Sequence, residues 1–146
     1  MQVQDKNQMG KVFTNITIIN NADQILAEAG FLAEEQVRSV TLENVLVDTG
    51  ATTLCLPAEI IAKLGLRVLK EVDVVTAMGI GTTRVFQDAK INVDGREGTF
   101  ECLELPGGKN PLLGVIPLEA LGLELDLKNQ HLKVLPISPT ETYLTI

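Results

Sequence analysis

The sequence predicts a single domain of mainly β structure with two or three short helices. Aromatic residues make up only 3% of the 146 residues and Trp is absent, so the core must rest on Val, Ile and Leu, which favour sheets. Short apolar or alternating runs recur along the chain, and Gly, Asn, Asp or Pro separates them. A chain of this length buries roughly 70% of its unfolded surface, which is enough for one core.

Seven segments are predicted to be β-strands because apolar residues recur at every second position or in short runs between turn residues. Asp94-Gly95 is the clearest turn signal, since this pair favours a tight hairpin. Gly79 and Gly81 stand between two β-like runs and predict a hairpin with a mobile tip. The predicted strands cover residues 12–19, 36–47, 67–75, 84–93, 98–105, 123–127 and 131–135.

Short helices are expected where residues that begin and end helices flank an apolar pattern. Asn21 is expected to cap the first helix, and Pro57 suits the first turn of the second. A glycine follows each helix and is expected to stop it. The helices are predicted over residues 22–29, 57–64 and 117–121.

The net charge of −7 arises from 19 acidic and 12 basic residues, and no Lys/Arg cluster is present. Both observations argue against nucleic acid as a partner. The first residues, Met1 to Lys6, are polar, so no signal peptide is expected. No apolar run approaches the length of a membrane span. We therefore expect a cytoplasmic protein that does not enter a membrane.

The tripeptide Asp48-Thr49-Gly50 is the strongest candidate for a functional site. An acidic residue here stands between two apolar runs, Val45-Leu46-Val47 and Leu54-Cys55-Leu56. Burying a lone carboxylate is costly, so Asp48 must be solvated, paired or functional. Gly50 allows a tight turn that brings the backbone close to the carboxylate.

The tripeptide alone is weak evidence, because at average residue frequencies it occurs by chance in about one chain in thirty of this length. One alternative is an ordinary turn in which the Asp48 side chain accepts hydrogen bonds from nearby backbone amides. On that interpretation the chain is an unrelated β-barrel. The rest of the sequence has to distinguish these alternatives.

A second motif, Leu112-Leu113-Gly114, leads into a short apolar segment. Together with residues 46–51 and the Gly79/Gly81 hairpin between them, it resembles the signatures of retroviral-type aspartic proteases, in particular their small single-domain bacterial relatives. The resemblance covers residues 11–135. It implies a retropepsin-like closed β-barrel whose flap is the glycine hairpin.

The resemblance also implies an activity, that of an aspartic endopeptidase acting on extended peptides with apolar side chains. Its catalytic residues would be Asp48, Thr49 and Gly50, with no cofactor and no metal. Because the sequence holds one Asp-Thr-Gly, the second carboxylate would come from another copy, which makes a homodimer a requirement of the mechanism. The substrate-binding residues would be Ala51, Met78, Gly79, Ile80, Gly81 and Leu112, with Leu46, Val75 and Leu113 adding to the apolar lining.

The sequence departs from the retroviral pattern at one pair of positions. Retroviral enzymes usually carry an Asp after Asp-Thr-Gly-Ala and an Arg after the second glycine, and these two side chains pair. Here the positions hold Thr52 and Val115, so both partners are missing together. The departure leaves a second function open, a catalytically inactive retropepsin-like module for dimerisation or peptide binding.

The two ends of the chain are expected to lie outside the domain. Residues 1–10 are polar and are expected to form a flexible tail. Residues 136–146 contain a β-prone stretch that is either a frayed end or a strand across the dimer interface.

The remaining reactive side chains give weaker signals. Cys55 and Cys102 lie in apolar runs and are expected to act as small buried hydrophobes, with a disulfide as the alternative. His131, the one histidine, stands beside a polar turn and is expected at the surface. No Cys or His spacing suggests a metal site.

Overall fold

The computed structural model describes residues 11–106, 109–136 and 146. The strands of this part are β1 Val12–Asn20, β2 Ser39–Val47, β3 Leu54–Pro57, β4 Arg67–Thr76, β5 Gly79–Val93, β6 Arg96–Leu105, β7 Leu112–Leu113, β8 Leu123–Asp126 and β9 His131–Val134. The helices are α2 Asn21–Glu28, the 3₁₀ turn η1 Glu34–Gln36, α3 Ala58–Leu64 and α4 Val115–Ala120. Among these helices, none combines the length and the apolar character needed to cross a bilayer.

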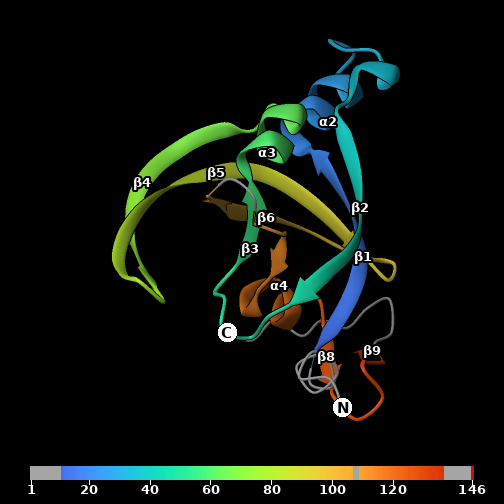
Figure 1. Ribbon diagram of the computed structural model, residues 1–146. Helices are drawn as coiled ribbons and strands as arrows, with labels where there is room; N and C mark the ends of the chain where they lie inside the picture. Colours follow the sequence, from blue (N-terminus) through green and yellow to red (C-terminus); the bar gives the residue numbers. More distant parts are fainter. Residues whose placement is uncertain (1–10, 107–108, 137–145) are drawn as a thin grey trace.

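Seven strands form one sheet in the order β1-β2-β7-β3-β6-β5-β4. Residues 17–20 of β1 also pair with residues 89–92 of β5, which closes the sheet into a ring from which β4 extends (Figure 1). The pairings of β2 with β7 and of β3 with β6 are parallel, whereas the others in this sheet are antiparallel. β8 and β9 form a separate hairpin. The predicted mainly β fold is confirmed.

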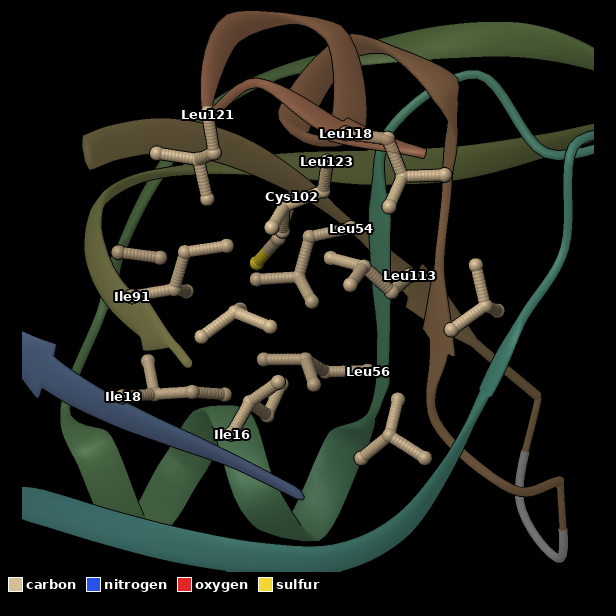
Figure 2. Packing of buried hydrophobic residues seen from close by; sticks show 14 of the residues in the cluster. Ile16, Ile18, Leu54, Leu56, Ile91, Cys102, Leu113, Leu118, Leu121 and Leu123 are labelled. Atoms are coloured by element: carbon tan, nitrogen blue, oxygen red, sulfur yellow. The ribbon is translucent and has the colours of Figure 1, made fainter. Parts of the chain in front are cut away.

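The core fills the inside of this ring and holds side chains from β1, β3, β5, β6, β7, α4 and β8 (Figure 2). β3 is buried at all four positions because it runs through the middle of the sheet. Burial of each large aliphatic side chain contributes about 1.5–3 kcal/mol, and this term offsets the cost of ordering the chain. The most enclosed members include Ile16, Ile18, Leu54, Leu56, Ile91 and Leu113.

The start of α2 differs from the prediction by one residue. Asn20, rather than Asn21, caps the helix: its side-chain oxygen accepts a hydrogen bond from the Asp23 amide at 3.0 Å. The Asn20 side-chain amide also donates to the Leu64 carbonyl at 2.8 Å, so one buried residue joins the start of α2 to the end of α3. A side chain that serves two helices in this way is not visible in a local sequence pattern.

Other boundaries shift for local reasons. β2 begins at Ser39 rather than residue 36, because Glu34–Gln36 forms the 3₁₀ turn. The strand predicted to begin at residue 84 begins at Gly79, since its pairing with β4 continues to the hairpin tip. α4 begins at Val115 rather than residue 117. The strands β3 and β7 and the turn η1 were not predicted as elements, whereas the other elements have the predicted type and differ at their ends.

Three turns agree closely with their sequence signals. Asp94 and Gly95 both have positive φ, 50° and 85°, as a two-residue hairpin requires. Gly65 ends α3 in the left-handed conformation. The predicted stop at Gly122 also has a positive φ, and Arg96 fastens the following hairpin by donating to the carbonyls of Leu121 and Leu135.

Candidate active site

Asp48 follows directly on the last residue of β2 and is partly exposed. Val45 and Val47 are buried in the core, so by strand alternation Leu46 and Asp48 lie toward the opposite face. The Asp48 amide donates to the Leu113 carbonyl at 2.9 Å, which fixes the end of β2 beside β7. The carboxylate thus stands where the strand leaves the sheet, with access to solvent.

A tight turn holds one oxygen of the Asp48 carboxylate. The Gly50 amide donates to Oδ1 at 2.8 Å, and the Ala51 amide donates to the Asp48 carbonyl at 3.0 Å. A β-carbon on Gly50 would stand 3.1 Å from Oδ1, so a side chain here would crowd the carboxylate. Within the described residues this is the one hydrogen bond made by that carboxylate, and the exposed Thr49 hydroxyl makes none.

The second motif packs directly against this loop through Gly114. A β-carbon on Gly114 would stand 2.4 Å from the Thr53 carbonyl oxygen and 2.6 Å from the Ala51 carbonyl oxygen, so only glycine fits. The Val115 amide donates to the Ala51 carbonyl at 3.0 Å, and the Ile116 amide donates to the Thr52 carbonyl at 2.9 Å. The start of α4 therefore locks the segment that follows Asp48. The sequence indicated Gly114 as part of a motif. The structure shows why glycine is required there, namely its close approach to the carbonyl oxygens of Thr53 and Ala51.

An apolar row crosses the sheet on the face of Asp48. Strand register places Leu46 beside Leu112, Leu112 beside Cys55, and Cys55 beside Leu103. Leu46, Leu112 and Leu103 are each partly exposed. Leu113, predicted to add to this lining, is instead fully buried on the core side, because it alternates with Leu112. The sequence did not predict that Cys55 and Leu103 belong to this apolar row, because the row depends on pairing of β3 with β6 and β7, which are distant in the chain.

The predicted glycine hairpin is present, formed by β4, β5 and the turn Ala77-Met78. Gly79 has φ 114°, and the Thr76 hydroxyl accepts from the Met78 amide at 3.1 Å, which defines the tip. Met78 is 96% exposed and Ile80 is 80% exposed. Figure 1 shows the hairpin bent into a long arc away from the ring. Its tip therefore presents apolar side chains that the described part of the chain does not cover.

The two positions that lack the retroviral charge pair lie in segments joined by backbone hydrogen bonds, from Val115 to Ala51 and from Ile116 to Thr52. Thr52 is exposed and Val115 is partly buried. The neighbouring hydroxyl of Thr53 donates to the Glu101 carbonyl at 2.9 Å, which ties the loop to β6. The loop is thus held by hydrogen bonds to α4 and β6 without a charged pair at these positions.

Both cysteines are free and buried, as small hydrophobes. Register places Cys102 opposite Leu54 and Cys55 opposite Leu103, so the two thiols lie on opposite faces of the sheet. Burial, and secondarily the charge of Asp48, raises the pKa of Cys55 to about 11. Burial also raises the pKa of Cys102 to about 12. These thiols have no reactive character near neutral pH.

The other acidic candidates have local partners. Asp94 forms its hairpin turn, and the Asp126 carboxylate accepts from the Asn129 side chain at 2.8 Å. Hydrogen bonds from Asn129 lower the pKa of Asp126. His131 is exposed, with Nε2 3.9 Å from Asp126 Oδ2. Across the described ranges, no group of three or more His, Cys, Asp or Glu side chains is arranged to hold a metal ion.

Comparison with known proteins supplies the family. Residues 36–120 match the family described as "gag-polyprotein putative aspartyl protease". No match was found among curated proteins. The matched segment exceeds half of the chain and contains both the Asp48-Thr49-Gly50 turn and the Leu112-Leu113-Gly114 motif that packs on it. The protein therefore belongs to this family of retroviral-type aspartyl protease-like domains.

Proposed function

We propose that this protein is an aspartic endopeptidase whose active site is formed by Asp48 from each subunit of a homodimer. The observation that carries the proposal is the partly exposed Asp48 carboxylate, held on one oxygen by Gly50 in a loop that Gly114 locks. One such carboxylate per chain supplies half of the required pair. Two chains together supply a general base for the attacking water and a general acid for the carbonyl oxygen.

The two carboxylates would share one proton, because like charges about 3 Å apart do not both ionise readily. Thr49 would brace the two loops by hydrogen-bonding across the twofold axis, a role for which its exposed hydroxyl has no competing partner in the described residues. Gly50 would leave room for the substrate backbone. No metal or cofactor is required by this chemistry.

The proposed substrate is an extended peptide with apolar side chains next to the cleaved bond. Leu46, Leu112 and Ala51 would contact those side chains, and their partial exposure on the Asp48 side supports this role. Met78, Gly79, Ile80 and Gly81 would close over the peptide and exclude water. Burial against a substrate would also cover the apolar side chains at the hairpin tip.

The dimer would form without the usual Asp/Arg pair. We propose that residues 11–135 form the protease domain and that residues 136–146 add a strand to the interface. Most of that tail lies outside the described residues. Deleting residues 140–146 should shift the protein toward monomer in sedimentation, and an unchanged dimer would remove this part of the proposal. The two free cysteines fit a reducing compartment, so we propose the cytoplasm as its location.

A peptide-library digest of wild type and Asp48→Asn, from acid to neutral pH, tests the proposal. Wild type should cleave and the variant should not. Cleavage that persists in Asp48→Asn would rule out the mechanism. Retention of library peptides without cleavage by either protein would favour the inactive binding module.

A mixing experiment tests the shared site directly. Wild type is mixed with an equal amount of Asp48→Asn and re-equilibrated, and its activity is compared with the same amount of wild type alone. Random pairing should leave about half of the activity, because half of the wild-type chains then sit in dimers with one carboxylate. Unchanged activity would show that a single chain is sufficient.

A further inference from the structure

The connection between β1 and β2, residues 21–38, forms a lobe that carries α2 and η1 at the end of the ring opposite to Asp48 (Figure 1). The buried Asp23 carboxylate fixes this lobe: it accepts hydrogen bonds from the Arg38 amide at 3.0 Å and from Arg38 Nε at 2.8 Å. The Lys90 ammonium of β5 also donates to Gln24 on α2 at 2.9 Å. The lobe is therefore held at both ends and along α2.

Three large apolar side chains stand exposed on this fixed lobe, and we call them the α2 patch: Ile25, Leu26 and Phe31. Phe31 is 81% exposed and Ile25 is 54% exposed. The Phe31 amide donates to the Leu26 carbonyl at 2.8 Å, so the ring projects from an ordered turn rather than from a loose loop. Full burial of such a side chain contributes about 1.5–3 kcal/mol, and the exposed part of each leaves a share of this unused in the isolated chain. Exposed apolar patches are a feature of protein interaction sites.

A surface hollow lies beside the α2 patch. Ile25 and Leu26 form one wall of a surface hollow that continues to Arg38 and Arg67. Both cations are already neutralised, Arg38 by Asp23 at 2.8 Å and Arg67 by Asp88 at 3.0 Å. The hollow thus offers an apolar wall without unpaired positive charge.

The charged side chains near the patch that form no salt bridge are three carboxylates and the Lys90 ammonium, which donates to Gln24. Glu28 lies one helical turn after Ile25, and Glu34 and Glu35 lie in η1, which contacts α2. All three are exposed, and none forms an ion pair within the described ranges. A symmetric pairing of two α2 patches would bring the carboxylates of one chain toward those of the other, and this repulsion between like charges is unfavourable. The charge pattern therefore favours a basic partner over a second copy of this chain.

We propose that the α2 patch docks a segment of another protein in which apolar side chains are flanked by Lys or Arg. The apolar side chains would cover Phe31 and enter the hollow beside Ile25, and the cations would face Glu28, Glu34 and Glu35. The nine residues of β2 span roughly 30 Å between this lobe and Asp48, so docking leaves the protease site open. The patch also precedes residue 36, where the family match begins, so the family match does not assign it a role.

Binding of synthetic peptides to the full-length chain tests this proposal. The probe is a fluorescent helical peptide with Leu on one face and Lys on the other, measured by anisotropy against the Asp48→Asn protein so that it is not cut. Two matched peptides carry the same pattern, with Glu in place of Lys or with Ser in place of Leu. Only the Leu/Lys peptide should bind.

The protein variants locate the binding. Phe31→Ser and Ile25→Ser should each weaken the affinity about tenfold or more, and a Glu34→Lys/Glu35→Lys variant should weaken it and reduce its salt dependence. Leu127→Ser, an exposed apolar residue on the β8–β9 hairpin, is the matched control and should leave affinity unchanged. Circular dichroism should show that each variant remains folded.

Three binding results would overturn the proposal: the Leu/Lys peptide fails to bind, its affinity is unchanged by Phe31→Ser, or the matched peptide with Ser in place of Leu binds equally well. A sedimentation experiment in which Phe31→Ser dissociates a dimer would assign the α2 patch to a second copy and would equally overturn it. None of these results depends on whether Asp48 is catalytic.

Discussion

Gly114 and Thr53 approach so closely that a β-carbon on Gly114 would stand 2.4 Å from the Thr53 carbonyl oxygen. This contact joins the two motifs that the sequence shows far apart. Along the chain, β7 pairs with β2, and Gly114 then packs against the loop that follows Asp48. The first amides of α4 donate hydrogen bonds to the carbonyls of that loop. The position of the Asp48 carboxylate depends on this crossing.

Gly114→Ala should therefore destabilise the fold and displace the Asp48 loop. The backbone φ of −94° suits any residue, so the cost comes from overlap with backbone atoms that cannot rotate away. Overpacking of this kind costs about 1–3 kcal/mol or more in the free energy of unfolding, measured by urea denaturation. Gly81→Ala, where an added β-carbon meets nothing within 4 Å, is the stability control. Equal stability of the two variants would contradict the argument.

Asp23→Asn should destabilise the protein and reduce its sensitivity to acid. Hydrogen bonds from Arg38 hold the pKa of Asp23 below its ordinary value, and breaking a charged hydrogen bond costs about 1.5–3 kcal/mol at neutral pH. Because the folded pKa is depressed, this stabilisation is complete above the unfolded pKa of about 3.9 and is lost as pH falls through the folded pKa.

Urea midpoints from pH 7 to pH 2 measure this effect. The acid-induced loss of stability should be smaller in Asp23→Asn than in wild type. Part of it should remain, since hydrogen bonds from Arg84 lower the pKa of Glu104 in the same direction. An unchanged pH profile would show that Asp23 contributes nothing to acid sensitivity.

Ile80→Ser should lower kcat/KM without changing stability. The side chain is exposed at the hairpin tip, so its loss removes no packing from the free protein, whereas a closed hairpin would lose apolar contact with the peptide. A loss of about tenfold corresponds to roughly 1.4 kcal/mol of binding. Leu127→Ser, exposed elsewhere, should leave kcat/KM unchanged. An equal effect of the two substitutions would remove the hairpin from the substrate site.

Cys55 and Cys102 should resist thiol reagents until the protein unfolds. With pKa values of about 11 and about 12, both are protonated at pH 8, and both are buried. A colorimetric disulfide reagent should detect no thiol in the native protein and two in urea. Fast labelling of Cys55 in the native state would instead show that the face carrying Asp48 opens.

Much of the local structure was predictable from neighbouring residues. Asp94-Gly95 and the Gly79 hairpin follow from the backbone freedom of glycine, and Gly65 ends its helix for the same reason. The position of Asp48 at the end of an apolar strand was equally visible. Asn20 and Asn21 are both suitable caps, so the local pattern placed the cap one residue too late, and the bond from Asn20 to the Leu64 carbonyl of another helix was not visible in it.

The sequence by itself determined that the chain is mainly β, that Asp48 leaves a buried strand through a tight turn, and where the hairpins lie, because these properties depend on residues within a few positions of one another. Only the tertiary structure decided that β1 closes the ring on β5, that Gly114 passes against Thr53, and that Phe31 stands uncovered on a fixed lobe. Such contacts join distant segments, and the chain selects them by burying the whole core at once rather than by any local preference.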